Sequence, residues 1–284
     1  MQNSFAVHMK RTRSGKISLK SGEKSERVMK LTLILLVVLT IGAVFFFDFT
    51  GFQLQKAIVD TTHNLKMMFL LPKLSHFSIG EAFVQVAITI ALAVLSTILG
   101  AVIAFFLALL AATNLSKEWI SRTIRVIVAF IRAVPTVLWV LIFAISAGLG
   151  SEAAVVGMLF HSIAYLVKAY SEAFEEVAPG IIESLRATGS SWWHVVRHGI
   201  LPSTWTYLMS WTFLRFEINF GVAVAMGAAA GAGGIGFELF MASGFYFDFQ
   251  EVGLITYIIL VIAIILEMLS TQLKERYMQG VSNR

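Results

Sequence analysis

The longest apolar run of this sequence, 82–116, contains 35 residues and no charged side chain. A helix that crosses a bilayer needs about 20 mostly apolar residues, so this run suits one tilted or projecting crossing. Hydrophobic residues make up 57% of the chain and charged residues 14%, against about 45–50% and 25% in ordinary globular domains. Such a composition excludes a disordered chain and a soluble enzyme. It predicts an all-α, polytopic membrane protein.

Five other apolar runs extend this pattern. Together they predict six transmembrane helices: Leu31–Phe47, Ala82–Ser116, Ala133–Ser151, Ala153–Val167, Pro202–Ala230 and Gly253–Leu273. The expected organisation is a basic cytoplasmic arm (1–30), an anchor span with an extracytoplasmic loop (31–80), a transmembrane domain (81–275) and a cytoplasmic tail (276–284). Since no small-residue cleavage site follows Phe47, the first span is expected to be an uncleaved anchor.

The positive charges fall almost entirely on one side of these spans. Of the 22 lysines and arginines, 18 lie in segments on one side, three lie on the other, and Arg215 lies inside a span. Lysine and arginine concentrate in cytoplasmic segments, so both termini are predicted to be cytoplasmic. The basic arm either serves this topology alone or is also held near anionic membrane lipid. The net charge of +5 is attributed to orientation in the membrane and not to a nucleic-acid partner.

The connection between the fourth and fifth spans has a helical composition. Pro179-Gly180 separates an acidic segment, 171–177, from a second short helical segment, 181–187. Gly189 is suited to end the second helix in a left-handed conformation, and one of the serines that follow can cap the next helix. The sequence therefore predicts a turn-bounded helix on the cytoplasmic side, which either docks onto a partner or is only a compact connector.

This connection resembles the EAA motif of ABC-importer permeases, which reads E-A-A, three residues, Gly, nine residues and I-x-L-P. Four residues stand at the spacing of the motif: Glu183, Gly189, Leu201 and Pro202. Three depart from it: Ser184 and Leu185 replace the alanines, and Gly199 replaces the isoleucine. The resemblance implies a coupling helix near 181–189 that docks in a groove of a cytoplasmic ATPase. The residues implied in coupling are Glu183, Ser184, Arg186, Ala187, Gly189, Leu201 and Pro202.

A wider likeness to the phosphonate-importer permeases covers residues from about 80 to 275. It is carried by Arg132-Ala133, Gly148-Leu149-Gly150, His161, Lys168, Ser171-Glu172-Ala173, Pro179-Gly180, Arg186-Ala187-Thr188-Gly189, Arg215-Phe216-Glu217 and Gly231–Gly236. The likeness implies a type I, methionine-permease-like bundle in the bacterial inner membrane, without enzymatic activity of its own. It would import phosphonates or related phosphorus oxyanions, including phosphite and phosphate esters.

The same resemblance implies several partners. They are a second permease copy in a homodimer, two ABC ATPase subunits that bind ATP and Mg²⁺, and an extracytoplasmic phosphonate-binding protein. Two alternatives stay open. One is an ABC permease for another small solute such as methionine, and the other is a secondary transporter driven by an ion gradient.

Arg215 and Glu217 are ionisable residues inside a predicted span, where each charge costs about 2.5–3.5 kcal/mol on insertion scales. Residues two apart do not share a helix face, so each needs its own partner or an irregular backbone. Both are candidates to line the translocation path: Arg215 would contact an anionic substrate, while Glu217 is expected to set the helix geometry or to balance the charge of Arg215. A structural charge network between helices is the alternative.

Six glycines lie within 221–236, and Gly231–Gly236 spells G-x-G-x-x-G. In dinucleotide sites that fingerprint follows a strand, whereas here it follows a membrane span, and no Lys-Ser/Thr of a nucleotide loop comes after it. The chain has no cysteine, so it has no disulfide framework, thiolate zinc site or cysteine nucleophile. No catalytic residue, metal site or cofactor of its own is expected in this chain. Gly231, Gly233 and Gly234 are candidates to line a translocation path, although close helix packing is the favoured interpretation.

Overall fold

The computed structural model describes residues 9–11, 17–19, 23–46, 51 and 53–282. The chain forms two compact units, Met1–Asp60 and Thr61–Arg284. The first unit contains the predicted anchor span, and the second contains the predicted transmembrane domain.

The first unit consists of a short strand pair and one long helix. Its elements are strand β1 (Met9–Arg11), the antiparallel strand β2 (Ile17–Leu19) and helix α1 (Glu23–Phe45). Within α1, the 21 residues Ser25–Phe45 are apolar enough to cross a bilayer. Glu26 and Lys30 pair at 2.9 Å, one helical turn apart, which supports a helix start inside the predicted basic arm. Most of that arm, 1–30, lies outside the described residues.

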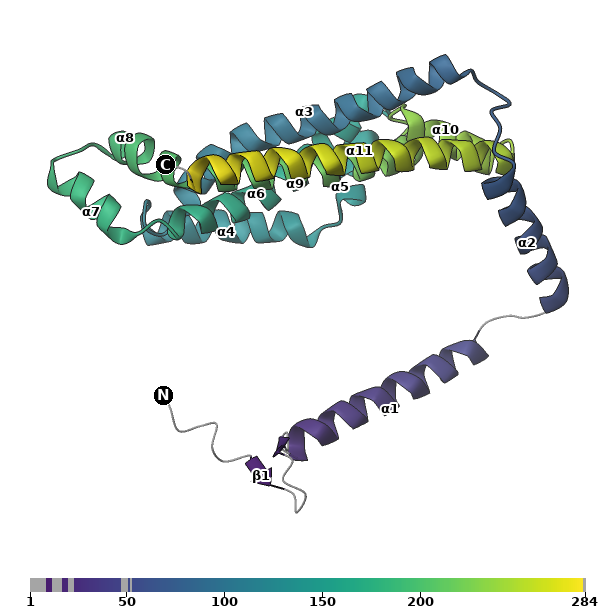
Figure 1. Ribbon diagram of the computed structural model, residues 1–284, viewed down its shortest axis with the longest axis horizontal. Helices are drawn as coiled ribbons and strands as arrows, with labels where there is room; N and C mark the ends of the chain where they lie inside the picture. Colours follow the sequence, from purple (N-terminus) through teal and green to yellow (C-terminus); the bar gives the residue numbers. More distant parts are fainter. Residues whose placement is uncertain (1–8, 12–16, 20–22, 47–50, 52, 283–284) are drawn as a thin grey trace. The chain divides into compact units, whose positions relative to one another are not determined.

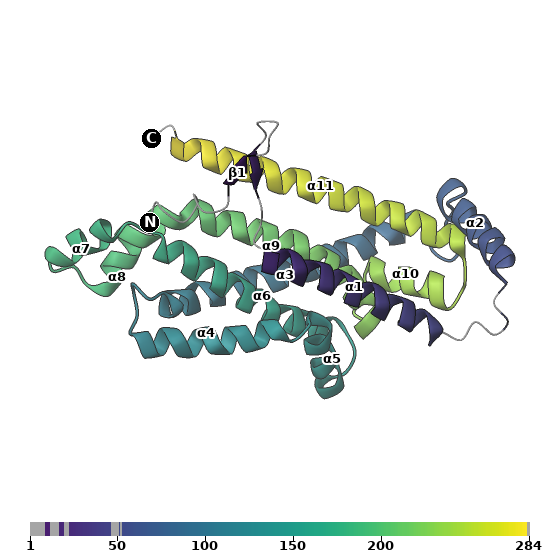
Figure 2. The ribbon, with the colours of Figure 1, turned by 90° about the horizontal axis from the view of Figure 1, so that it is seen from below.

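The second unit is helical throughout its described part. Its elements are α3 (Ile79–Ala111), α4 (Glu118–Ala133), α5 (Thr136–Ala147), α6 (Ser151–Glu175), α7 (Pro179–Ala187), α8 (Trp192–Val195), the π-helical turn η2 (Val196–Ile200), α9 (Leu201–Ala230), α10 (Ile235–Gly244) and α11 (Phe249–Ser282). Figures 1 and 2 show α3, α4, α6, α9 and α11 lying broadly along one common axis, with α7 and α8 at one end of the bundle and α10 at the other. Helix α2 (Leu54–Leu70) lies within the segment predicted as an extracytoplasmic loop and ends in this unit.

Helix α3 forms one wall of the bundle and makes its most extensive contacts with α6. A capping box fixes its start: the Ser78 hydroxyl accepts from the Glu81 NH at 3.2 Å, and the Glu81 carboxylate accepts from the Ser78 NH at 2.6 Å. Small side chains then let the two backbones approach each other closely. A Cβ on Gly100 of α3 would lie only 2.9 Å from the Cβ of Ser162 on α6.

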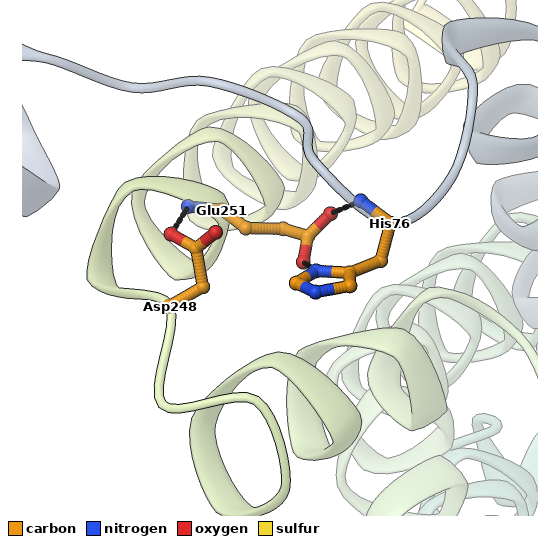
Figure 3. Close-up of side chains that lie close together, drawn as sticks. All are labelled: His76, Asp248 and Glu251. Atoms are coloured by element: carbon orange, nitrogen blue, oxygen red, sulfur yellow. Dashed lines mark hydrogen bonds and ion pairs between the residues drawn. The ribbon is translucent and has the colours of Figure 1, made fainter.

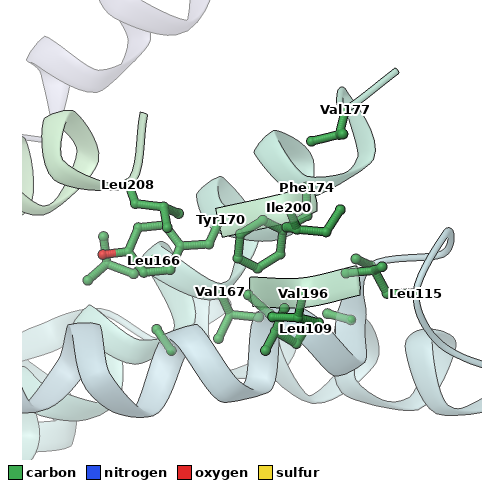
Figure 4. Close-up of a cluster of buried hydrophobic side chains, with 14 of the residues drawn as sticks. Leu109, Leu115, Leu166, Val167, Tyr170, Phe174, Val177, Val196, Ile200 and Leu208 are labelled. Carbon is green, nitrogen blue, oxygen red and sulfur yellow. The ribbon is translucent and has the colours of Figure 1, made fainter. Parts of the chain in front are cut away.

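An apolar core lies at the α7 end of the bundle (Figure 4). Phe174 and Ile200 are completely buried there, and Phe105 meets Phe174 edge to face with ring centres 6.0 Å apart. Elsewhere many large aliphatic side chains on α3 and α11 remain exposed. Such outward apolar surface is expected where lipid, and not water, surrounds the helices.

The structure differs from the third predicted span, Ala133–Ser151. Helix α4 already begins at Glu118 and meets α5 at an 87° bend, so the predicted start at Ala133 is wrong. Pro135 explains the bend, because proline cannot donate a backbone hydrogen bond and restricts the residue before it. The arginines of α4 suggested a charged connection, whereas an amphipathic helix carries them beside an exposed apolar face.

Within the described part of the chain, five helices are long and apolar enough to cross a membrane, and the bent α4–α5 pair makes six if it counts as one span. Helix α5 has 12 residues and is therefore about 18 Å long, too short for a hydrocarbon core of about 30 Å without α4. The predicted all-α, six-span fold is confirmed, with shifted boundaries. The last helix, for example, extends to Ser282 and not only to Leu273.

Gly157 sets the distance between α5 and α6. A Cβ on this residue would lie 2.5 Å from the Cα and 2.6 Å from the N of Val140, so Gly157→Ala must push α5 away. We expect the free energy of unfolding to fall by about 1–3 kcal/mol, the usual cost of overpacking. Thermal unfolding of the purified chain in detergent measures this loss. Gly80→Ala is the matched control, because the atom nearest to its Cβ, Ser78 Oγ, is 3.9 Å away. Equal melting temperatures for the two variants would contradict the close contact.

Candidate functional site

Helix α7 has a bare outer surface at one end of the bundle. Ile182 is 4% exposed and anchors the helix to the bundle. Pro179 occupies the first turn of the helix, where a backbone NH would have no hydrogen-bond partner within the helix, so proline is tolerated there. The residues predicted to take part in coupling on this helix are exposed: Glu183, Ser184, Arg186 and Ala187. All four are therefore accessible to a partner, as residues of a docking surface must be.

Two contacts hold α7 in place. The Nη2 of Arg186 donates to the carbonyl of Asn114 at 3.2 Å, in the loop between α3 and α4. The second contact depends on Gly199 of η2, because a Cβ there would lie 2.9 Å from Cδ1 of Leu185. The glycine that replaces the isoleucine of the EAA motif therefore lets α7 pack directly on the backbone that leads into α9.

The turn after α7 has the predicted geometry. Gly189 has a φ of 77°, which confirms the left-handed helix end expected for it. Of the serines that follow, Ser191 caps α8, and its hydroxyl accepts from the backbone NH of His194 at 3.4 Å. Leu201 and Pro202 open α9 directly after the π-helical turn, and such turns are frequent at functional sites. The EAA-like segment is thus a turn-bounded helix, α7, followed after the turn at Gly189 by α8, η2 and α9, which form one continuous helix.

Arg215 lies in the interior of the bundle and is 2% exposed. Its Nε donates to Ser162 Oγ of α6 at 3.1 Å, and its guanidinium lies 5.4 Å from the centre of the Tyr165 ring, within the range of a cation–π contact. Among the described residues its Nη2 has no hydrogen-bond partner. Guanidinium groups bind oxyanions through such donors, and contact of Arg215 with a substrate stays a prediction.

Glu217 does not pair with Arg215. Helix α9 runs unbroken through both positions, so the two side chains leave the helix on different sides. Within the described residues Glu217 forms no ion pair, and it is only half-buried. Of the two alternatives that the sequence allowed, separate partners or an irregular backbone, the structure shows a regular helix in which Arg215 contacts α6.

The residue that joins the helices around Arg215 is Asn219, which the sequence prediction did not include. Its amide donates to Thr97 Oγ1 at 2.8 Å, to Ser162 Oγ at 2.9 Å and to Ser96 Oγ at 3.3 Å. A polar cluster thus links α3, α6 and α9 at membrane depth, where interhelical hydrogen bonds hold helices together. The available signal was an asparagine one turn after Arg215 in an otherwise apolar run.

The glycines after α9 form a sharp connection into α10. Gly231, Gly233 and Gly234 have φ values of 61°, 74° and 75°, which residues with side chains rarely adopt. The NH of Gly234 donates to Oε1 of Gln85 at 3.0 Å, and the next NH donates to Oγ1 of Thr89 at 3.0 Å. Backbone conformation and contact with α3 therefore account for these glycines, and their role in a translocation path stays a prediction.

A buried carboxylate joins the segment before α3 to the start of α11 (Figure 3). Oε1 of Glu251 accepts from the NH groups of Ser75 and His76 at 3.0 and 2.9 Å, and Oε2 lies 2.6 Å from His76 Nδ1. Tyr246 stacks on the His76 ring at 3.8 Å. His76, Asp248 and Glu251 present potential metal-ligand atoms within 4.8 Å of one another. Both oxygens of Glu251 are already bonded to protein donors, so the cluster acts as a structural clamp.

Asp248 supports this clamp by capping α11. Its Oδ1 accepts from the NH groups of Gln250 and Glu251 at 3.0 and 3.1 Å. Burial alone would raise the pKa of Asp248, but the hydrogen bonds from these NH groups and from Ser75, with the nearby His76, hold the pKa below its ordinary value. Asp248 therefore stabilises the fold above the usual titration range of aspartate, and this contribution is lost as the pH falls through the lowered pKa.

Residues 104–279 match the family described as "Binding-protein-dependent transport system inner membrane component". The chain belongs to this family. It is therefore a multi-pass inner-membrane protein and a transport subunit, not an enzyme.

The chain is similar to permease proteins whose names state what they transport. The chain is 31% identical over 200 residues to the phosphate-import permease protein PhnE of Mycolicibacterium smegmatis. This alignment covers 69% of this chain and 37% of that protein. The chain is 30% identical over 190 residues to the phosphite transport system permease protein PtxC of Stutzerimonas stutzeri, covering 66% of this chain and 68% of that protein. The chain thus spans little more than a third of the length of the first relative.

The fold of this family member is found in a solved importer. The inward-facing MetNI methionine ABC transporter matches with a TM-score of 0.62 at 20% identity, over 68% of this chain and 94% of that chain. The prediction of a methionine-permease-like ABC importer bundle is confirmed by this likeness and by the family.

The clamp at Glu251 should contribute measurably to the stability of the chain. Glu251→Gln removes the charge that accepts three hydrogen bonds, so we expect the free energy of unfolding to fall by about 1.5–3 kcal/mol. Chemical unfolding of the purified chain in detergent gives this value. Glu118→Gln is the control, since the Glu118 side chain is 81% exposed and exposed ion pairs contribute about 0–1 kcal/mol. The clamp is contradicted if both variants unfold like the wild type.

Proposed function

We propose that this chain is the transmembrane permease subunit of an ATP-driven importer for phosphonates or related phosphorus oxyanions, such as phosphite and phosphate esters. Membership of the transport family supports the permease role. The names of the phosphate and phosphite permease relatives support the class of substrate. The observation that carries the proposal is the exposed, turn-bounded α7, because its Glu183 and Gly189 stand at the spacing of the EAA motif and are accessible to a partner.

The complex would contain a second copy of this chain, two cytoplasmic ABC ATPase subunits and an extracytoplasmic phosphonate-binding protein. ATP and Mg²⁺ would be bound by the ATPase subunits and not by this chain. The uneven distribution of lysine and arginine supports an orientation with both termini and α7 in the cytoplasm. The basic arm would then lie beside the anionic inner leaflet.

The path of coupling would start at α7. Closure of the ATPase dimer moves the surface that carries Glu183, and Leu185 transmits this movement to the backbone of η2 through its contact at Gly199. Since η2 continues directly into α9, the movement reaches Arg215 and the polar cluster around it. The other predicted coupling residues, Leu201 and Pro202, lie at the start of α9, between these two regions.

The choice of substrate within this fold rests on the relatives. The similarity to the methionine importer concerns the fold, whereas the relatives at 30% and 31% identity are named phosphite and phosphate permeases. Arg215 is compatible with either solute, because guanidinium groups bind both phosphates and carboxylates through paired hydrogen bonds. The names of the relatives therefore favour a phosphorus oxyanion over methionine. Binding of labelled methylphosphonate, tested against methionine with the cognate binding protein, decides between them.

Substitutions in α7 should uncouple transport without preventing membrane insertion. Glu183→Arg reverses a charge on the docking surface, and Gly189→Pro imposes a negative φ where the chain has +77°. We expect phosphite uptake into proteoliposomes to fall by about tenfold or more, as when a charge at an interface is mismatched. Glu118→Arg, an exposed reversal on α4, serves as the control. Full uptake and full substrate-stimulated ATP hydrolysis by both α7 variants would rule out α7 as the coupling element.

Arg215→Lys separates a transport role of Arg215 from a structural one. Lysine keeps the charge but loses the planar fork that suits oxyanions, so we expect normal assembly with the ATPase and uptake reduced by roughly tenfold. Complex yield and uptake are measured on the same reconstituted samples. A purely structural Arg215 would give wild-type uptake per assembled complex, or no assembly. Arg215→Ala is less informative, because it also removes contacts to Ser162 and Tyr165.

A further inference from the structure

A second group of cations lies between α4 and α6, away from the polar cluster around Asn219. There the two helices enclose a cavity of about 190 Å³. Its polar lining consists of Arg125, Arg132, Lys168, Ser171 and Glu172, and aliphatic side chains complete the wall. Because one water molecule takes about 30 Å³ of liquid, the cavity has room for a phosphorus atom and its oxygens.

The charges around this cavity do not cancel. Arg125 forms an ion pair with Glu175, and Lys168 is 3.6 Å from the Glu172 carboxylate, with both side chains about half exposed. Arg132 has no carboxylate partner among the described residues. Three cations thus face two carboxylates. The loose, exposed pair of Lys168 contributes little by itself, so its ammonium is available to another anion.

We infer that this cavity binds a phosphate-type group, in which several oxygens surround one phosphorus atom. Arg132 is the primary ligand, because its planar guanidinium can donate two parallel hydrogen bonds to such a group. Lys168 and Arg125 add charge from the two sides of the cavity. A carboxylate presents two oxygens in one plane, whereas a phosphate-type group places its oxygens in three dimensions around one phosphorus atom and can reach cations on both sides of the cavity.

The phosphate-type group can come from two sources. A free oxyanion would be the cargo on its way through the membrane, and this source rests on the proposed function. A lipid headgroup is the other source, because basic pockets between transmembrane helices bind anionic lipid. The outer face of α4 suits the acyl chains of such a lipid: Trp119, Val126 and Phe130 on this face are each 64% to 67% exposed.

Direct binding to the purified full-length chain tests the site without relying on transport. The chain is delipidated in dodecyl maltoside, which contains no phosphorus. One arm measures equilibrium binding of radiolabelled inorganic phosphate and phosphite. The other arm measures retention of added phosphatidylglycerol, against uncharged diacylglycerol, by native mass spectrometry. Binding in the first arm supports the site with a free anion as ligand, and binding in the second supports it with a lipid headgroup.

Matched variants assign the binding to this cavity. Arg132→Gln should weaken binding in the positive arm by roughly tenfold or more, as expected when a charge-assisted hydrogen bond is lost. Arg122→Gln should bind like the wild type, since Arg122 lies on the same helix, outside the cavity, and pairs with Glu118 at 2.5 Å. Lys168→Gln should weaken binding too, and it replaces Arg132→Gln if that variant does not fold. The inference is overturned if neither ligand binds, or if Arg122→Gln loses as much affinity as Arg132→Gln.

Discussion

Three helices of the bundle meet at the side-chain amide of Asn219. Inside a bilayer no water is available for unpaired donors, so the hydroxyls of Ser96, Thr97 and Ser162 must lie where this amide reaches them. The cluster therefore fixes how α3, α6 and α9 are rotated against one another. Arg215 depends on the same junction, because Ser162 accepts from both its guanidinium and the amide. The position of the buried cation is thus a consequence of how the helices are joined.

The two ends of the bundle are built differently. At the α10 end, Glu251 is saturated by three hydrogen bonds, and the glycine connection is bonded to side chains of α3. At the α7 end, the helix is held by one buried isoleucine, one side-chain hydrogen bond and the contact over Gly199. Elements with few buried contacts open at low free-energy cost. Helix α7 itself is such an element, although a large apolar core lies beneath it at the same end of the bundle.

The sequence was sufficient for those features that depend on local composition. Long apolar runs and uneven charge predicted the spans, and the spacing around Gly189 predicted the turn after α7, because each depends on neighbouring residues alone. The start of α4 was missed, since an amphipathic helix with three arginines has the composition of a connecting segment. The pairing of His76 with Glu251 joins residues 175 positions apart and leaves no trace in one sequence. Asn219 could have been identified, as a polar residue in an apolar run.

The π-helical turn between α8 and α9 holds one surplus residue in an otherwise continuous helix. That residue turns everything that follows it by about 100° relative to an uninterrupted helix and shifts it by about 1.5 Å. The side of α9 that carries Asn219 toward α3 and α6 therefore depends on η2 as well as on the residues of α9 itself.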